Sequence, residues 1–361
     1  MEISKKINDP FPLEGGVVGE YKHLLVIRLS AMGDVAMTVP VLLALTKQHP
    51  RLKITVLTRA FFRPMFSQVP NVAIFEADVK GKHKGVFGLY KMYKELKKLN
   101  FTAVADLHNV VRSNVLKCFF KIGGVSFIQI DKGRAEKKAL IDINNKVLKS
   151  LKTTHQRYAN VFNDLGFSID INNTQLLPKG PLSDKMLQTI GFDSRRWIGI
   201  APFAAFKGKM YPLELIKEII KELNTTEKYK IILFGGGKQE QEQLEALAEQ
   251  FDHAINVAGK FSFEQELSLV SNLDAMVAMD SGNAHLAAMY AIPTITLWGV
   301  THPNAGFAPY KQKVNVLLAD RIKYPLIPTS IYGNKFPAGY EKAIETITPS
   351  MVINKIKEVL V

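Results

Sequence analysis

From Lys22 onward, apolar runs of strand length alternate with segments of helical periodicity, and the same alternation starts again after residue 185. Parallel strands need crossover connections of this kind, and helices on both faces bury the strands, so this order predicts doubly wound parallel sheets. The expected strands are HLLVIRL, KITVLTR, VAIFEA, AVADLH and VSFIQI in the first half, and WIGIAP, KIILFGG, AINVAG, AMVAMD and TITLWG in the second. Two such series indicate two α/β domains.

The length of 361 residues agrees with two domains, each of about 150 to 180 residues. A polar, proline-containing stretch marks the boundary, and Thr348 and Pro349 suit the cap and first turn of a final helix. The expected parts are an extension, expected to be disordered (1–21), an N-terminal domain (22–175), a linker (176–185), a C-terminal domain (186–347) and a helix that packs at the domain junction (348–361).

Two of the expected strands end in a glycine turn directly before a helix. The first strand breaks at 30–34 (SAMGD), and AMVAMD leads into 280–283 (DSGN). Unpaired N–H groups and the helix dipole favour a phosphate at such a position, although either turn alone is also an ordinary helix cap. Ligands of open α/β sheets bind outside the carboxyl ends of the strands. We therefore expect a nucleotide diphosphate at the second turn and an active site in the cleft between the domains.

The net charge of +14 is confined to the N-terminal half of the chain. Residues 1–185 contain 29 Lys and Arg against 15 Asp and Glu, whereas residues 186–361 contain 18 of each kind. Such an excess attracts an anionic surface, which is phospholipid, phosphorylated glycolipid or nucleic acid. The alternative is that these charged side chains lie on solvent-exposed helix faces and bind no partner. Because no nucleic-acid recognition fold or aromatic platform stands out, we expect no nucleic-acid partner.

The sequence favours a protein of the cytoplasm. No apolar stretch approaches the length of roughly 18 to 20 residues that spans a bilayer, and residues 1–20 lack the apolar segment of a signal peptide. The single cysteine, Cys118, cannot form an internal disulfide, which fits a reducing compartment, and its apolar surroundings predict burial.

Two further classes of site are disfavoured. The chain has no Asp-x-Asp pair and no tight cluster of His or Cys, so we expect no metal. Neither glycine turn is a complete G-x-G-x-x-G with an acidic residue at the end of the next strand, and KITVLTR ends in Arg59. This argues against a dinucleotide-dependent oxidoreductase.

Both glycine turns carry motifs that resemble glycosyltransferase family 9, the heptosyltransferases that build the lipopolysaccharide inner core. RLSAMGDVAMTVPVL resembles the family's R-x-S-x-G-D-x-x-x-T-x-P-x-L, and VAMDSGNAHLAAMYAIPTITLWGVTHP resembles D-[ST]-G-x-x-H-L-A-A-A-x-x-x-P-x-x-x-L-[WY]-G-x-T. The likeness runs from about Lys22 to Val361. It implies the GT-B fold, with the acceptor on the N-terminal domain and the nucleotide sugar on the C-terminal domain.

The resemblance implies an inverting transfer of a heptose from ADP-heptose to an anionic lipopolysaccharide inner-core acceptor, either Kdo-lipid A or a heptosyl acceptor. The reaction would be a single displacement at the inner leaflet of the cytoplasmic membrane, by a peripherally bound monomer without cofactor or metal. Two alternatives stay open. One is transfer from another nucleotide sugar, and the other is a GT-B-like sugar-nucleotide epimerase, which would need no basic N-terminal face.

The resemblance also implies the catalytic residues. Asp34 takes the role of general base on the acceptor hydroxyl, a role that suits a carboxylate in a desolvated cleft, where burial raises its pKa; its plainer interpretation is a helix cap. Lys209 stands where the family has the lysine of K-x-W-P and would neutralise the leaving diphosphate. The neighbouring Lys207 is the alternative, and an ordinary surface lysine is the plainer interpretation.

The remaining site residues follow from the same resemblance. For the donor we expect Asp280, Ser281, Gly282, Asn283, His285, Gly235 and Glu240, with Glu242 as the alternative to Glu240. For the phosphates and carboxylates of the acceptor we expect Gly33, Lys80, Lys82, Lys84, Arg112, Arg134, His155 and Arg157. Taken singly, His285 is more often a packing residue and each basic side chain more often solvated. The family's usual residues differ at Met37 and Asn283, where His and Leu are common, and this affects acceptor or donor preference rather than reaction class. Tyr211 replaces the family's usual Trp beside the two lysines, which leaves the choice between Lys209 and Lys207 open.

Overall fold

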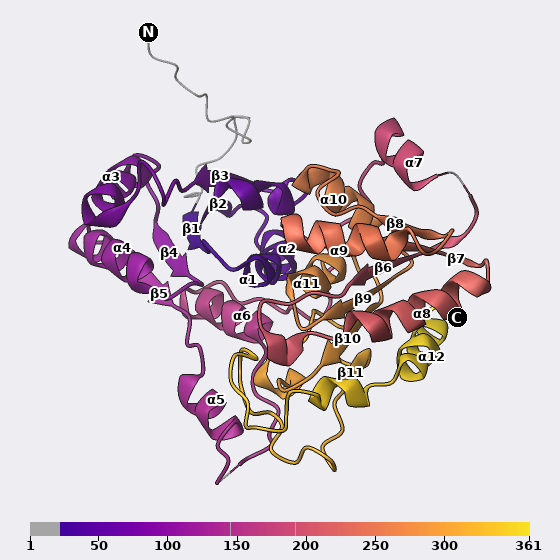
Figure 1. Ribbon diagram of the computed structural model, residues 1–361. Coiled ribbons are helices and arrows are strands. Elements are labelled where there is room, and N and C mark those ends of the chain that lie inside the picture. Colours follow the sequence, from indigo (N-terminus) through magenta and orange to yellow (C-terminus); the bar gives the residue numbers. More distant parts are fainter. Residues whose placement is uncertain (1–21, 145, 192) are drawn as a thin grey trace. The chain divides into compact units, whose positions relative to one another are not determined.

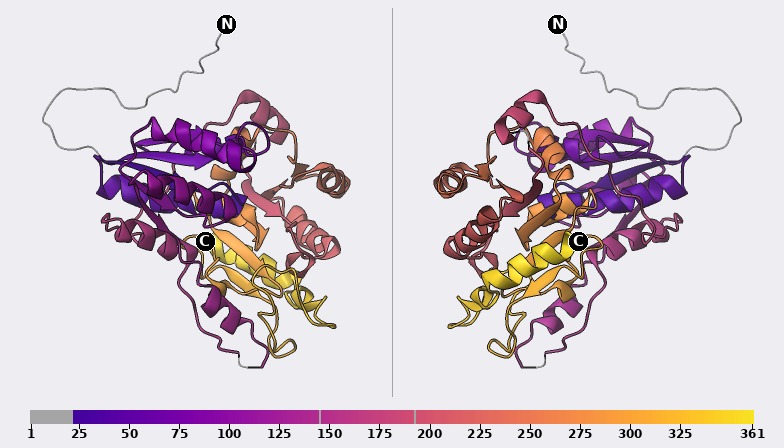
Figure 2. Two further views of the ribbon diagram at one scale, coloured as in Figure 1. Left: turned by 90° about the vertical axis from the view of Figure 1, so that its left-hand side faces the viewer. Right: turned by 90° about the vertical axis from the view of Figure 1, so that its right-hand side faces the viewer.

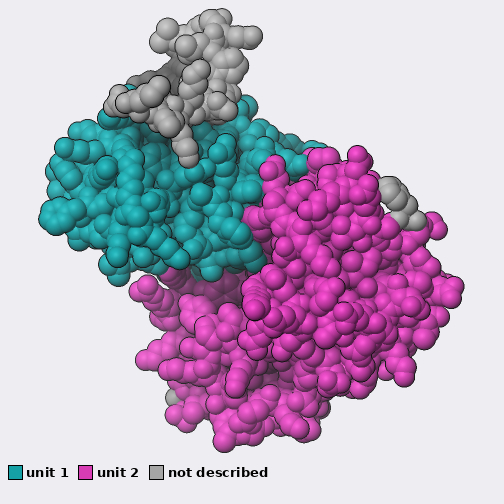
Figure 3. All heavy atoms as spheres, turned by 45° about the horizontal axis from the view of Figure 1, so that its top comes forward, with its two compact units in different colours: residues 1–131, 155–175 teal, residues 132–154, 176–361 magenta. Residues whose placement is uncertain are grey.

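The computed structural model describes residues 22–144, 146–191 and 193–361 (Figure 1). The expected extension, 1–21, lies outside the described residues. The chain divides into two compact units (Figure 3): unit 1 runs up to Asp131 and includes His155–Gln175, and unit 2 comprises Lys132–Thr154 and Leu176–Val361. Among the described residues, no helix is long and apolar enough to cross a membrane.

Unit 1 contains a five-stranded parallel sheet in the order β3-β2-β1-β4-β5. Its strands are β1 (His23–Ile27), β2 (Lys53–Thr58), β3 (Val72–Glu76), β4 (Ala103–Asp106) and β5 (Ser126–Gln129). Its helices are α1 (Met32–Ala36), α2 (Thr38–Gln48), the 3-10 helix η1 (Ala60–Phe66), α3 (Gly85–Lys97), α4 (Val111–Ile122) and most of α6 (Thr154–Asp164). The central strand β1 is buried from Leu24 to Ile27, which explains its uninterrupted apolar sequence.

Unit 2 contains a six-stranded parallel sheet in the order β11-β10-β9-β6-β7-β8. Its strands are β6 (Arg196–Ala201), β7 (Tyr229–Leu233), β8 (Ala254–Asn256), β9 (Ala275–Met279), β10 (Thr294–Trp298) and β11 (Val316–Leu318). Its helices are α5 (Arg134–Leu140), α7 (Asp184–Ile190), η2 (Lys207–Lys209), α8 (Leu213–Thr225), α9 (Lys238–Ala248), α10 (Phe263–Ser271), α11 (Gly282–Ala288), η3 (Pro303–Ala305), η4 (Ala343–Thr346) and α12 (Pro349–Val359).

The expected doubly wound architecture is confirmed, and each of the ten expected strands corresponds to one of β1 to β10. The short edge strand β11 was not expected, because its three residues lie in a region whose sequence has the character of a loop. The C-terminal helix is present as α12. Thr348 caps it by accepting a hydrogen bond from Met351 N at 3.3 Å, and it packs on α8 within unit 2 through buried Val352 and Ile356.

The segment 132–154 is grouped with unit 2, although we expected it in the N-terminal domain. Two backbone hydrogen bonds attach its end to the loop around η3: Leu151 N donates to Asn304 O at 2.9 Å and Thr154 N to Gly306 O at 2.8 Å. Gly306 has a φ of 87°, and a Cβ there would lie 2.5 Å from a backbone oxygen of this segment. Only glycine therefore allows this close approach.

The expectation that Cys118 is buried is wrong, because its side chain is exposed. Helix α4 buries Ser113, Leu116 and Phe120, and position 118 lies between the last two on the opposite side of the helix. The apolar run around this cysteine reflects a partly covered helix face, not a fully buried helix.

Replacing Glu266 by Gln tests a half-buried carboxyl in α10. Burial raises the pKa of Glu266 from 4.5 to about 7. Between these values the folded state holds a proton that the unfolded state releases, so the unfolding free energy falls as pH rises from 4.5 to 7. We expect E266Q to be more stable than the wild type by about 1–2 kcal/mol at about pH 8 and nearly equal at about pH 4.5. Urea unfolding at both pH values measures this; the exposed Glu264→Gln is the control, and equal stability at the higher pH would contradict the expectation.

Candidate functional site

Lys209 and Asp280 form a largely buried ion pair in unit 2. Lys209 Nζ lies 2.8 Å from Asp280 Oδ2 and donates a hydrogen bond to Asp280 O at 3.1 Å. The side chains are only 15% and 7% exposed. Thr301 Oγ1 donates to Asp280 Oδ2 at 3.0 Å, so the carboxylate has a second partner. An ammonium group has three N–H donors, and the two bonds to Asp280 leave one donor for a ligand.

Three glycines determine where Lys209 lies. A Cβ on Gly333, which has a φ of 79°, would lie 2.5 Å from Lys209 Cγ. A Cβ on Gly299, just after β10, would lie 2.4 Å from Gly208 O, and Val300 N donates to that same oxygen at 3.0 Å. The missing side chains thus let η2 lie against the end of β10, which brings Lys209 to the end of the neighbouring strand β9.

Ser281 precedes α11 as its N-cap residue, but its side chain makes no capping hydrogen bond. Its Oγ is buried and has no hydrogen-bond partner among the described residues. A buried hydroxyl without a partner costs about 1–3 kcal/mol, so this group favours a ligand that supplies an acceptor. Gly282 and Asn283 are half-buried, and His285 is buried at 7% exposure. The β9–α11 turn therefore places the unsatisfied Ser281 hydroxyl next to Asp280, which is the partner of the Lys209 ammonium.

The loop between β7 and α9 contains the other expected donor residues. Gly236 N donates to Glu240 Oε2 at 2.8 Å, and a Cβ on Gly235 would lie 2.8 Å from Leu244 Cδ1. Glu242 is 66% exposed and only pairs with Lys238 at 3.7 Å. The structure thus places Glu240, and not Glu242, against the glycine loop at the carboxyl end of β7.

In unit 1, Asp34 is the third residue of α1, directly after β1. Its Oδ2 lies 2.6 Å from Arg28 Nη2 and accepts a hydrogen bond from Ala31 N at 3.3 Å. We expected a desolvated carboxylate; the side chain is instead 29% exposed and paired with a buried guanidinium. Tyr158 donates to Asp34 O at 3.2 Å, and burial raises the pKa of the Tyr158 hydroxyl, which therefore remains a donor. Arg28 and Ala31 N thus hold the carboxylate, Tyr158 holds the backbone of Asp34, and part of the carboxylate stays accessible.

The expected acceptor residues do not gather in one place. Lys80, Lys82 and Lys84 are exposed in the β3–α3 loop, where Lys82 pairs with Glu95 at 2.8 Å. The others are placed as follows: Gly33 beside Asp34 in α1, Arg112 exposed at the start of α4, His155 buried in α6, Arg157 buried in α6 with Asp131 at 3.5 Å, and Arg134 exposed in α5 of unit 2. Arg134 thus belongs to the unit that carries the expected donor residues.

Three polar residues near the ends of the strands are not among those predicted from the sequence. Arg28 lies inside the RLSAMGD motif, and its position in the motif was the available signal. His108 follows β4, with its Nε2 3.4 Å from Ser30 Oγ, and it connects the ends of β4 and β1. Thr301 bonds to Asp280 from the loop after β10. These contacts depend on which strands are neighbours in the sheet, and the sequence alone does not show that order.

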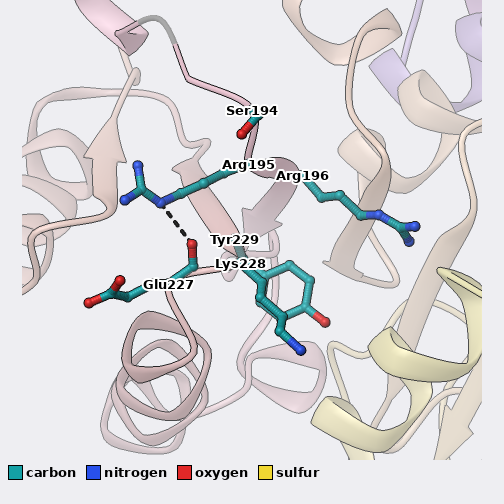
Figure 4. A pocket seen from close by; sticks show the side chains of 6 residues that line it. All are labelled: Ser194, Arg195, Arg196, Glu227, Lys228 and Tyr229. Carbon is teal, nitrogen blue, oxygen red and sulfur yellow. Dashed lines mark hydrogen bonds between the residues drawn. The ribbon is translucent and has the colours of Figure 1, made fainter.

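One surface pocket lies away from all of these residues. It has a volume of about 390 Å³ and lies at the amino-terminal ends of β6 and β7 (Figure 4). Its lining comprises Ser194, Arg195, Arg196, Glu227, Lys228 and Tyr229. Arg195 Nε donates to Glu227 O at 2.9 Å across it. Lys209 and Asp280 lie at the opposite, carboxyl ends of the strands, so this pocket is not part of the candidate site.

In the part of the chain that the structure describes, no group of three or more His, Cys, Asp or Glu side chains could hold a metal ion. Beside the β9–α11 turn, the Lys209 ammonium can offset the charge of an anionic ligand. The residues described at this site offer an ammonium and N–H or O–H donors to an anionic ligand.

Known glycosyltransferases are similar to this chain. Residues 89–329 match the family model described as glycosyltransferase family 9 (heptosyltransferase). The lipooligosaccharide heptosyltransferase 2 of Haemophilus influenzae is 27% identical over 354 residues, which cover 94% of this chain and 99% of that protein.

Two solved structures share the fold. The family 9 glycosyltransferase of Veillonella parvula superposes with a TM-score of 0.74 at 20% identity, covering 96% of this chain and 99% of that one. The E. coli heptosyltransferase WaaC, solved with ADP-2-deoxy-2-fluoro heptose, superposes with a TM-score of 0.64 at 21% identity, covering 93% and 99%.

Two parallel α/β sheets, each with polar residues at the carboxyl ends of its strands, together with these neighbours show the GT-B fold. The match over two thirds of the sequence is specific to one family. The chain belongs to glycosyltransferase family 9.

Proposed function

We propose that this enzyme transfers a heptose from ADP-heptose, with inversion, to an anionic lipopolysaccharide inner-core acceptor at the cytoplasmic face of the inner membrane, where it binds peripherally as a monomer. The observation that carries the proposal is the Lys209–Asp280 pair beside the unsatisfied Ser281 hydroxyl, within a chain of the heptosyltransferase family. The relatives named above support the heptose and the ADP moiety. Family membership also disfavours the epimerase alternative.

The donor chemistry follows from unit 2. The remaining N–H of Lys209 and the Ser281 hydroxyl would bind the diphosphate, and Asp280 would hold the ammonium in place while its free lone pairs accept from sugar hydroxyls. Charge grows on the β-phosphate oxygen as the bond to the anomeric carbon breaks. A fixed cation at that oxygen stabilises the transition state more than the bound substrate.

The acceptor chemistry follows from unit 1. Asp34 would accept the proton of the acceptor hydroxyl while that oxygen forms its bond to the anomeric carbon, and nucleoside diphosphate leaves from the opposite side. Arg28 and Ala31 N orient the carboxylate for this step. The exposed bases Lys80 and Lys84, which follow β3 in the chain, and Arg112, which follows β4, would bind acceptor phosphates and carboxylates.

Calorimetric titration with ADP, GDP and UDP, with and without EDTA, tests the donor site. We expect preferential ADP binding that survives EDTA, followed by transfer from ADP-heptose. Ser281→Ala should weaken ADP binding about 5- to 10-fold, because a hydrogen bond is lost. The same change should stabilise the free protein slightly, because an unsatisfied buried hydroxyl is removed.

Ser271→Ala is the matched control, since Ser271 Oγ is also in unit 2 but has partners: it donates to Ser268 O at 2.7 Å and accepts from Gly180 N at 2.7 Å. We expect this variant to lose stability and keep its ADP affinity. Tighter binding of UDP or GDP, or a strict metal requirement, would remove ADP-heptose as the donor while the glycosyltransferase class remains.

A further inference from the structure

The outer face of α3 carries aromatic and basic side chains instead of a polar mixture. Phe87, Tyr90, Lys91, Lys94 and Lys98 repeat at three- and four-residue spacing, so they share one side of the helix. Phe87 is 92% and Tyr90 44% exposed, whereas the opposite side buries Leu89, Met92 and Leu96. We call this outer set of five residues the α3 face.

The surroundings of the α3 face are strongly basic. Residues 78–124 contain ten Lys and Arg against three Asp and Glu. Of the acidic groups, Asp106 is fully buried and Glu95 is paired with Lys82 and His83. The neighbouring helix α4 adds an exposed apolar side chain, Ile122, which is 86% exposed beside Lys121 (Figures 1 and 2 show α3 and α4 side by side). The local field therefore attracts anions.

Packing holds the α3 face in position. The Tyr90 and Tyr93 rings contact the Phe119 ring of α4, with centroids 5.4 and 5.5 Å apart. At the start of α3, a Cβ on Gly88 would lie 2.4 Å from the backbone carbon of His83, so the first turn lies tightly against the preceding loop. Phe87 thus projects from an ordered helix. An exposed aromatic among lysines on such a helix is the composition of a helix that lies on a membrane surface.

We propose that the α3 face docks unit 1 on an anionic phospholipid surface, with Phe87 entering the headgroup boundary and Lys91, Lys94 and Lys98 contacting lipid phosphates. The proposal rests on the proposed function in one respect, since a lipid-linked acceptor would be met at the same surface. Charge complementarity selects this occupant: lysines at this density bind anionic lipid and repel a basic partner, and the apolar ring gains by leaving water.

Cosedimentation of the full chain with vesicles tests the docking surface, using phosphatidylcholine alone and phosphatidylcholine with phosphatidylglycerol at about 3:1. We expect binding to the anionic vesicles only, weakened by salt. The triple variant K91E/K94E/K98E should lose about 100-fold in affinity and Phe87→Ser about 10-fold. The triple variant K313E/K335E/K342E makes the same change in charge at exposed positions of unit 2, and Ile322→Ser removes an apolar side chain that is 95% exposed. Both controls should bind as the wild type does.

Phe87→Trp adds a direct readout of insertion. The tryptophan emission of this variant should shift to shorter wavelength with anionic vesicles, whereas Ile322→Trp should show no shift. Equal binding by wild type and α3-face variants, equal binding to neutral vesicles, or an unshifted emission of the Phe87→Trp variant would overturn the proposal.

Transfer from ADP-heptose to a delipidated, water-soluble acceptor separates the docking surface from the proposed function. If the enzyme transfers heptose to the soluble acceptor but the α3-face variants bind vesicles as the wild type does, only the docking surface is wrong. If vesicle binding depends on the α3 face but no heptose is transferred, only the proposed function is wrong.

Discussion

Asp34→Asn should lower kcat for heptosyl transfer by about 10³-fold, because an amide cannot accept the proton of the attacking hydroxyl. The Asn oxygen can still accept from Arg28 and Ala31 N, so the local geometry should persist. ADP affinity should be unchanged, since the proposed donor residues belong to unit 2. Steady-state kinetics with ADP-heptose, combined with calorimetry of ADP binding, measure both quantities.

The neutral side chain leaves the buried Arg28 guanidinium without its carboxylate, so a loss of stability of about 1–3 kcal/mol is expected as well. Rates must therefore be compared below the unfolding temperature of the variant. Asp164→Asn, at an exposed position at the end of α6 in unit 1, makes the same change in net charge and should keep full activity. If Asp34→Asn retained more than about a tenth of the wild-type kcat, the general-base role would be excluded.

Lys209→Ala should also lower kcat by about 10³-fold and weaken ADP binding, because the cation at the leaving diphosphate is lost. The exposed Lys207, two residues earlier, is the natural control. Lys207→Ala should change kcat less than about 3-fold, since a solvated ammonium contributes little to a fixed site. The reverse result would assign the diphosphate to Lys207.

Stability complicates this variant too, since removing Lys209 leaves Asp280 as a buried charge without its partner. We expect a destabilisation of about 3–5 kcal/mol for the single variant. The double variant Lys209→Met/Asp280→Asn removes both charges and should recover most of that stability, with the Thr301 hydrogen bond available to the new amide. Activity should stay low in the double variant. Recovery of activity together with stability would show that Lys209 acts only through folding.

The fold could be predicted because its signals are local. Alternating apolar runs and helical segments define β1 to β10 and the helices between them, and the burial of Leu24 to Ile27 is what makes β1 apolar throughout. The same reasoning missed β11, because three residues are too short for a periodicity. It also gave the wrong burial for Cys118, since a run of apolar letters does not show which side of α4 is covered.

The candidate site could be predicted only in part. Asp34 and Asp280 are predicted from the sequence because each stands in a motif at the end of a strand, and their roles stay predictions. Arg28, His108 and Thr301 act across distances in the chain that no local pattern encodes: Thr301 bonds to a residue 21 positions away, and His108 approaches Ser30 across 78 positions. The segment 132–154 was assigned to the other unit for the same reason, since its ties to unit 2 are backbone hydrogen bonds to a loop more than a hundred residues later.

Read alone, the amino-acid sequence determined the two doubly wound sheets, the family and the residue types at the strand ends, because periodicity and short motifs are properties of neighbouring positions. Only the tertiary structure decided which of these residues are partners. Lys209 meets Asp280, 71 positions away, because Gly208, Gly299 and Gly333 let three backbone segments approach closely. The α3 face likewise became visible only when burial separated Leu89 and Met92 from Phe87, since packing, and not composition, decides which side of an amphipathic helix remains exposed.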